Sequence, residues 1–176
     1  YKYQSGWIYS WSLYSYGYFE VVAKMPMGNH VWPAFWLNDS NWDYPNCFYN
    51  EIDIQEICPQ FGSQANVIGT FLHVQNNPTG SIDCNNLNNF INHYGITNTG
   101  FPDLSTGYHT FACEWLPDRV VWYYDDQPIR EIFNNYEVIP NHPMHVILNV
   151  AVGATDFVPI SGKDAMIVDR FRYYQL

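Results

Sequence analysis

The 176 residues are enough for one domain with a substantial core and too few to favour two domains. Seven Lys and Arg against 17 Asp and Glu give a net charge of −10, which would repel phosphate backbones and argues against nucleic acid as a partner. No window approaches the ~18 uninterrupted apolar residues of a membrane span, so we expect no membrane insertion. The first residues lack a signal-peptide pattern, so we expect any leader to have been removed or left out of this sequence.

The elements predicted in chain order are almost all strands. Aromatic residues make up 19% of the chain, and apolar alternation is repeatedly interrupted by Gly, Pro, Asn and Asp. The predicted strands cover residues 16–25, 31–37, 51–56, 67–74, 108–115, 120–124, 129–133, 145–152 and 165–174. Residues 75–107 are predicted as one long polar loop. Strands joined by tight turns predict an all-β fold of antiparallel sheets, in a sandwich or jelly roll.

Four cysteines allow three complete disulfide pairings, and their spacing matches no zinc site. Cys113 lies within an apolar strand and is predicted to be a buried free thiol. The pairing of Cys47, Cys58 and Cys84 is left open, as is an extracellular setting.

The third predicted strand, EIDIQE, contains three carboxylic acids in six residues. Strict alternation would place Glu51 and Asp53 on one face and Glu56 among the isoleucines of the other, where an ionised carboxylate is costly. A bulge at residues 54–55 resets the alternation and brings all three acids to one face. The sequence therefore predicts a bulge.

Two carboxyl groups flanking one bond are what glycoside hydrolysis requires, and a retaining mechanism needs them about 5 to 5.5 Å apart. In that interpretation one Glu attacks the sugar, the other protonates the leaving oxygen, and Asp53 lies between them. A divalent-metal site and a solvent-facing acidic strand that discourages aggregation are the alternatives.

The chain resembles glycoside hydrolase family 16, the β-jelly-roll enzymes that include laminarinases, lichenases, agarases and carrageenases. The resemblance covers nearly the whole chain, and its motifs occur in the family's order. They are EIDIQE at 51–56, YGYFE at 16–20, KMP at 24–26, WPAFWL at 32–37, GT at 69–70 with His73, HTF at 109–111, EW at 114–115, PD at 117–118, WY at 122–123, LNVAVG at 148–153 and MIVD at 166–169 with Tyr173.

The resemblance implies catalytic roles: Glu51 as nucleophile, Glu56 as general acid/base and Asp53 as their electrostatic partner. It also implies a concave substrate cleft in a single catalytic domain over residues 1–176 that lacks the family's N-terminal strands.

Substrate-binding residues follow from the same resemblance. Trp32 and Trp36 share a face if the strand between them is extended, and Tyr49 directly precedes the acidic strand, so these three are candidate sugar platforms, with core packing as the alternative. His73 resembles a histidine of the family's cleft; a structural histidine is its alternative. Trp115 shares an apolar stripe with its neighbours and is assigned to the core.

The expected function is that of a secreted, monomeric, endo-acting retaining β-glycanase on a polysaccharide, with β-1,3- or β-1,3-1,4-glucan favoured. The alternatives are a galactan hydrolase of the agarase, porphyranase or carrageenase type, a transglycosylase, and a non-catalytic carbohydrate-binding module. Trp7, Tyr9 and Val22 stand where laminarinase-type members commonly have basic residues, which weakens the β-1,3-glucan assignment and enlarges an aromatic subsite. No cofactor is expected to be required, and a structural calcium ion at Asp169 is left open.

Overall fold

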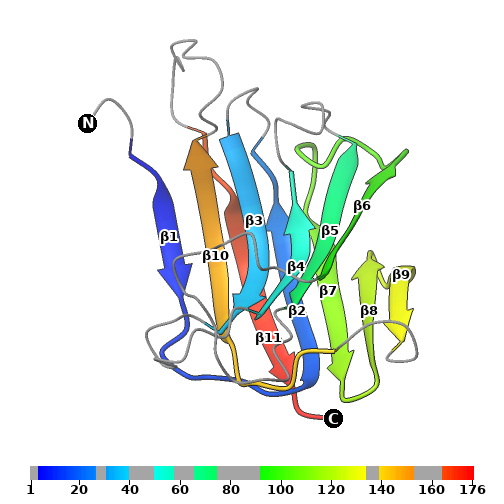
Figure 1. Cartoon of the computed structure of the whole chain (residues 1–176). Helices are drawn as coiled ribbons and strands as arrows, with labels where there is room; N and C mark the ends of the chain where they lie inside the picture. Colours follow the sequence, from blue (N-terminus) through cyan, green and yellow to red (C-terminus); the bar gives the residue numbers. More distant parts are fainter. Residues whose placement is uncertain are drawn as a thin grey trace.

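The computed structural model describes residues 4–26, 31–39, 50–57, 66–74, 92–133, 139–152 and 164–176. These residues form two antiparallel sheets that lie one behind the other (Figure 1). The six-stranded sheet has the order β1 (Gly6–Tyr9), β10 (His145–Val152), β3 (Val31–Asn38), β4 (Asn50–Glu56), β5 (Val67–Val74) and β6 (Asn92–Thr99). The five-stranded sheet has the order β11 (Ile167–Tyr174), β2 (Gly17–Lys24), β7 (His109–Leu116), β8 (Arg119–Tyr124) and β9 (Gln127–Phe133).

The core lies between the sheets because each central strand turns its apolar side chains inward. Phe19 of β2, Phe35 of β3 and Ile52 of β4 are fully buried, and so are Trp115 and Trp122 of the five-stranded sheet. The Trp115 indole donates a hydrogen bond to the Pro140 carbonyl at 2.9 Å, which satisfies its polar atom inside the core. The assignment of Trp115 to the core is confirmed.

One tight turn shapes the edge of the five-stranded sheet. The β8–β9 hairpin turns through Asp125 and Asp126, which have φ angles of 44° and 63°. Two successive positive φ values match the right-handed twist of the flanking strands, and Asp is one of the residues that tolerates them.

The nine predicted strands are confirmed, with ends that differ by one or two residues. The prediction of one loop over residues 75–107 is wrong over 92–99, where β6 pairs with β5 along its whole length. The sequence NHYGITNT has little apolar alternation because an edge strand needs a neighbour on one side only. The short edge strand β1 was not predicted either.

Cys113 is a buried free thiol, as predicted, and burial raises the pKa of that thiol well above its ordinary value. The other three cysteines lie outside the described residues. Within the described ranges, no helix is long and apolar enough to cross a membrane.

Candidate active site

The acidic strand β4 contains the predicted bulge. Against β5, Asp53 pairs with Phe71 and Glu56 with Gly69, so β4 advances three residues where its partner advances two. Against β3, the register also shifts between the residues that face Asp53 and Gln55. The extra residue therefore lies at 54–55, and the predicted bulge is confirmed.

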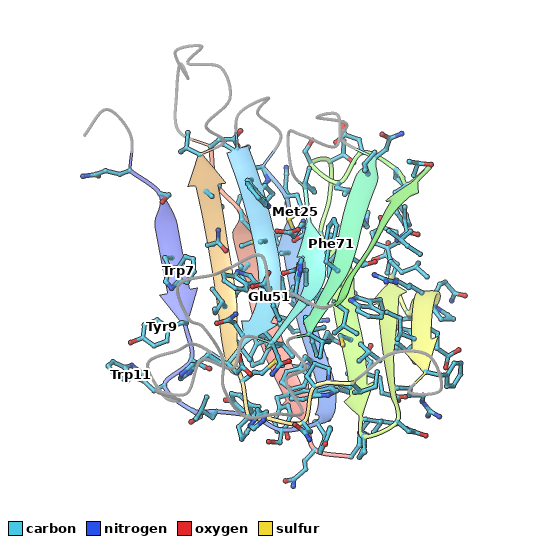
Figure 2. The ribbon with its side chains drawn as sticks, in the orientation of Figure 1. Trp7, Tyr9, Trp11, Met25, Glu51 and Phe71 are labelled. Carbon is cyan, nitrogen blue, oxygen red and sulfur yellow. The ribbon has the colours of Figure 1, made fainter. Side chains whose placement is uncertain are left out.

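The bulge separates acids from isoleucines as the sequence required. Ile52 and Ile54 are 0% and 2% exposed and belong to the core between the sheets. Glu51, Asp53 and Glu56 instead line a pocket of about 230 Å³ on the opposite face of the six-stranded sheet. Figure 2 labels Glu51 on this sheet. The remaining lining residues are Trp32, Ala34, Trp36, Asn149 and Ala151.

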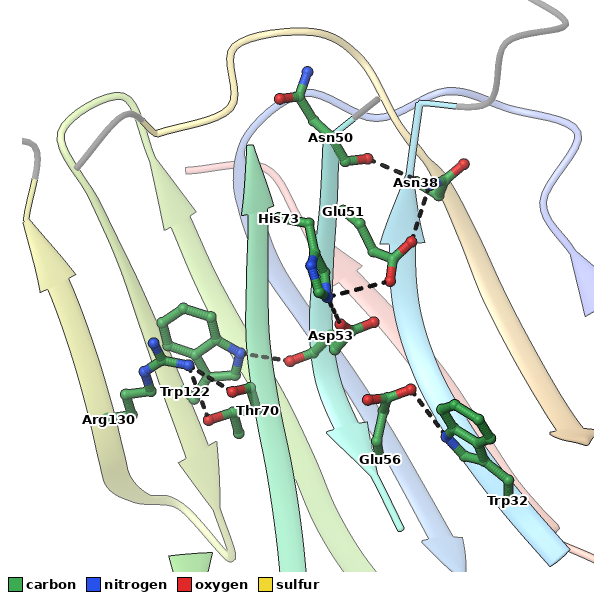
Figure 3. A network of polar contacts seen from close by, with 10 residues as sticks. All are labelled: Trp32, Asn38, Asn50, Glu51, Asp53, Glu56, Thr70, His73, Trp122 and Arg130. Atoms are coloured by element: carbon green, nitrogen blue, oxygen red, sulfur yellow. Dashed lines mark hydrogen bonds and ion pairs between the residues drawn. The ribbon is translucent and has the colours of Figure 1, made fainter. Parts of the chain in front are cut away.

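Glu51 and Asp53 are held by donors from the two neighbouring strands (Figure 3). The Asn38 amide, at the end of β3, donates to Glu51 Oε2 at 3.3 Å. From β5, His73 Nε2 lies 3.0 Å from Asp53 Oδ2 and 3.6 Å from Glu51 Oε1. A single imidazole nitrogen thus contacts both carboxyl groups, which fixes their positions relative to each other.

Asp53 is the most deeply buried of the three acids. The residue is 1% exposed, and burial raises the pKa of its carboxyl well above the ordinary value, with the charges of Glu51 and Glu56 acting in the same direction. Asp53 therefore favours its protonated form or a hydrogen bond shared with its neighbours over a free charge.

Glu56 lies beyond the bulge, next to Trp32. The Trp32 indole Nε1 donates to Glu56 Oε1 at 2.9 Å. Burial raises the pKa of the Glu56 carboxyl to about 7, the Trp32 hydrogen bond opposes this rise, and the nearby charge of Glu51 adds to it. Glu56 consequently retains a proton up to near-neutral pH, the property of a general acid.

A contact from the second sheet fixes the backbone of the bulged strand. Trp122, buried on β8, donates from its indole to the Asp53 carbonyl at 2.8 Å. The Arg130 guanidinium lies 4.7 Å from the centre of the Trp122 ring and donates to the Thr70 carbonyl of β5 at 2.6 Å. The acids thus lie on a strand that is anchored from behind (Figure 3).

Phe71 adds an aromatic ring beside the acids. Its ring stacks on His73, with centroids 6.0 Å apart and planes 11° apart. A Cβ atom at Gly69 or at Gly95 would overlap the Phe71 ring, so glycine at both positions leaves the space that the ring occupies. The sequence did not single out Phe71, because an aromatic residue in an alternating strand is equally typical of a core position.

The structure describes three of the four predicted substrate-binding residues. Trp32 and Trp36 line the same pocket, so the prediction that they share a face is confirmed. His73 contacts Asp53 and Glu51, while Tyr49 lies outside the described residues. Whether these side chains bind sugar stays a prediction.

Two asparagines of the site were missed by sequence reasoning. Asn38 contacts Glu51, and Asn149 accepts a hydrogen bond from the Trp36 indole at 2.7 Å. Asn149 interrupts the otherwise apolar run VILNVAV of β10, and such a polar residue in a central strand is a usable signal for a pocket.

Metal binding was one alternative for the acids. Glu51, Asp53 and His73 offer ligand atoms that all lie within 4.8 Å of one another, but the same atoms already contact each other and Asn38. At the suggested calcium position, the Asp169 carboxylate accepts a hydrogen bond from Arg170 at 2.8 Å. Both side chains of this pair are about half exposed, and a structural calcium ion at Asp169 stays an open possibility.

Two facing antiparallel sheets with a row of acids in an open pocket define a β-sandwich of the carbohydrate-active jelly-roll class. The model of Glycosyl hydrolases family 16 matches residues 1–163. The chain belongs to glycoside hydrolase family 16.

Relatives named as glucanases agree with that membership. An endo-1,3-1,4-beta-glycanase (ExsH) of Rhizobium meliloti is 30% identical over 181 residues, covering 100% of this chain and 34% of the relative. A glucan endo-1,3-beta-glucosidase of Cryptopygus antarcticus is 32% identical over 154 residues, covering 81% of this chain and 52% of the relative. The chain thus spans between a third and about half of these relatives.

A solved structure has the same fold. The catalytic domain of an endo-1,3-beta-glucanase (laminarinase) from Thermotoga petrophila superposes with a TM-score of 0.71 at 29% identity. The match covers 93% of this chain and 65% of that domain. The predicted jelly-roll sandwich is confirmed.

Proposed function

We propose that this chain is an endo-acting retaining β-glycanase that hydrolyses β-1,3- or β-1,3-1,4-glucan. The observation that carries the proposal is the arrangement of Glu51, Asp53 and Glu56 in one pocket, with the two glutamates in different environments. The glucanase activities of the relatives support the substrate class.

In the first step, the Glu51 carboxylate attacks the anomeric carbon while Glu56 transfers its proton to the departing glycosidic oxygen. The bond between sugar and leaving chain breaks as the bond to Glu51 forms, giving a glycosyl-enzyme and an ionised Glu56. The raised pKa of Glu56, about 7, keeps the proton on this residue before the step.

In the second step, the Glu56 carboxylate takes a proton from water, whose oxygen attacks the anomeric carbon and releases Glu51. Two displacements at one carbon retain its configuration. Charge on the neighbouring Glu51 disappears during the first step, which lowers the pKa of Glu56 and prepares it to act as a base.

Asp53 and His73 are positioning residues in this scheme. Asp53 lies between the two glutamates along the strand, and His73 holds it at 3.0 Å. Asn38 orients Glu51 through its amide. Trp32 and Trp36, and Tyr49 by extension from the sequence, serve as sugar platforms.

The test compares the wild type with Glu51→Gln on laminarin, lichenan, agarose, carrageenan and xyloglucan. We expect the wild type to release mid-length oligosaccharides from laminarin or lichenan, and the variant to lose activity while retaining its unfolding temperature. Activity retained by Glu51→Gln would refute the assignment of the nucleophile. Preferential cleavage of agarose or carrageenan would replace the glucanase by a galactan hydrolase.

Two other functions on this fold give different products. A transglycosylase would pass the sugar from Glu51 to an added acceptor oligosaccharide and lengthen it. A carbohydrate-binding module would bind glucan without cleaving it. The pocket with three acids favours hydrolysis over binding alone, because ionisable groups in a binding pocket carry a cost of desolvation.

We further propose that the enzyme acts as a secreted monomer, in which the chain forms a single catalytic domain, and that it requires no cofactor. Long polysaccharides are encountered outside the cell, which supports secretion. The chemistry outlined above needs only carboxyl groups and water, which supports independence from metals; activity after dialysis against a chelator tests this point.

A further inference from the structure

Three aromatic side chains are exposed along the edge of the six-stranded sheet. Trp7 and Tyr9 belong to β1, and Trp11 follows two residues later; they are 55%, 40% and 89% exposed. Figure 2 shows the three side chains one after another along this edge. Alternate residues of a strand lie on one face, so Trp7 and Tyr9 point to the same side.

The register of the sheet places that side on the face of the acids. Trp7 pairs with Asn149, Asn149 with Ala34, and Ala34 with Glu56, and directly paired residues of adjacent strands share a face. Asn149, Ala34 and Glu56 all line the pocket. Trp7 therefore lies in the same cross-strand row as Glu56, three strand spacings or about 14 Å away.

Ring contacts make the aromatic edge continuous with the pocket. The Trp7 ring meets the Trp36 ring edge-on, with centroids 5.4 Å apart and planes at 87°. Tyr9 lies 5.7 Å from Trp11 and 5.8 Å from the ring of His145 on β10. Trp36 itself lines the pocket, so aromatic surface extends from the acids across β10 to β1.

The charges on the two sheets differ. Five of the seven Lys and Arg residues are described, and all five lie on the five-stranded sheet: Lys24, Arg119, Arg130, Arg170 and Arg172. The described strands of the six-stranded sheet thus offer acids and aromatic rings without a Lys or Arg. A sulfated or carboxylated polysaccharide would meet no compensating Lys or Arg from these strands.

We propose that Trp7, Tyr9 and Trp11 form an extended sugar-binding platform for an uncharged polysaccharide. In this arrangement the polysaccharide extends from the acids across β10, and its outer sugar rings stack on the aromatic side chains at β1. The proposal rests on the proposed function, because Glu51 and Glu56 would cleave the same polysaccharide that the platform binds. The apolar faces of sugar rings stack on exposed aromatic rings. The distance between Trp7 and Glu56 is longer than one sugar ring, so only an oligosaccharide or polysaccharide contacts both residues.

The experiment measures binding in a background that does not turn over substrate. Laminaritriose and laminarihexaose are titrated calorimetrically into Glu51→Gln alone and combined with Trp7→Ala or Trp11→Ala. Losing one stacked aromatic ring is expected to weaken laminarihexaose binding roughly tenfold. The loss should be smaller for laminaritriose, which covers less of the platform than laminarihexaose does.

A matched control is Phe133→Ala, which removes an exposed aromatic ring, 47% exposed, from the edge of the other sheet. Trp7→Ala also removes a ring contact with Trp36 of the pocket. Trp11→Ala tests the platform without that change, because Trp11 contacts Tyr9 and lies beyond the end of β1. Equal laminarihexaose affinity in both tryptophan variants and the Phe133 control would overturn the platform, as would tighter binding of a κ-carrageenan oligosaccharide than of laminarihexaose.

This outcome is separable from the proposed function. If the wild type cleaves no glucan but Trp7→Ala still weakens laminarihexaose binding, hydrolysis fails and the platform stands. If the wild type cleaves glucan and both tryptophan variants bind laminarihexaose as tightly as the control, the platform alone fails.

Discussion

The hydrogen bond from Trp32 to Glu56 gives a sharp prediction about pH dependence. The bond stabilises the ionised carboxylate and so lowers its pKa, against burial, which raises it. Replacing Trp32 by Phe removes the donor and keeps an aromatic ring. The pKa of Glu56 should therefore rise above about 7, and the high-pH limb of the activity profile should move upward with it.

The magnitude follows from the geometry. A hydrogen bond of 2.9 Å to a partly buried carboxylate is involved. Such bonds contribute roughly 1.5–3 kcal/mol, and one pKa unit corresponds to about 1.4 kcal/mol. The full bond would thus give about one to two units. Glu56 lines an open pocket, where water replaces part of the lost bond, so we expect about 0.5–1 unit.

The assay is the pH profile of kcat/KM on a soluble glucan for the wild type, Trp32→Phe and Trp36→Phe. Trp36→Phe is the control, because the Trp36 indole donates to Asn149 rather than to a carboxyl group. Its high-pH limb should stay in place even if its KM changes. A limb that stays in place or moves downward in Trp32→Phe would refute the assignment of Glu56 as the acid.

Three further variants test stability and positioning. Folding raises the pKa of Glu56 from 4.5 to about 7. The contribution of Glu56 to stability is therefore fully present below pH 4.5 and is lost as the pH rises from 4.5 to 7. Glu56→Gln has no such group to ionise, so its unfolding free energy at pH 8 should exceed that of the wild type by about 1–3 kcal/mol. An unchanged pH dependence by denaturant titration would contradict this. His73→Ala leaves a buried aspartate without its imidazole partner and should lower kcat by about 10- to 100-fold with little change in KM; a change confined to KM would assign His73 to substrate binding instead. Gly95→Ala should displace Phe71 and cost about 1–3 kcal/mol in thermal unfolding, whereas Gly6→Ala, whose Cβ meets no atom within 4 Å, should cost much less; equal costs would show that the Phe71 ring has room to move.

The bulge could be predicted because regular strand alternation conflicts with the positions of the acids. Glu56 in regular alternation would have entered the core beside Ile52 and Ile54, and one extra residue resolved the conflict. The core strands were predictable for a related reason: an apolar face that alternates with a polar one specifies both the strand and its orientation.

The missed features share a different cause, since they depend on neighbours distant in the sequence. β6 is stabilised by pairing with β5 rather than by its own apolar pattern. The Asn38 contact with Glu51 arises because β3 ends beside the start of β4, and the Trp122 bond to Asp53 crosses between the two sheets. Side-chain contacts of this kind depend on the register between strands and on the packing of the two sheets, and neither can be predicted from a local sequence pattern.

Covalent trapping shows whether Glu51 is the nucleophile of a retaining hydrolase. A 2-fluoro laminaribiosyl fluoride slows the second step, so a glycosyl-enzyme accumulates and its peptide is identified by mass spectrometry. We predict a single added disaccharide on Glu51, the first acid of β4. A label on another residue, or no label together with inverted products by NMR, would contradict the assignment.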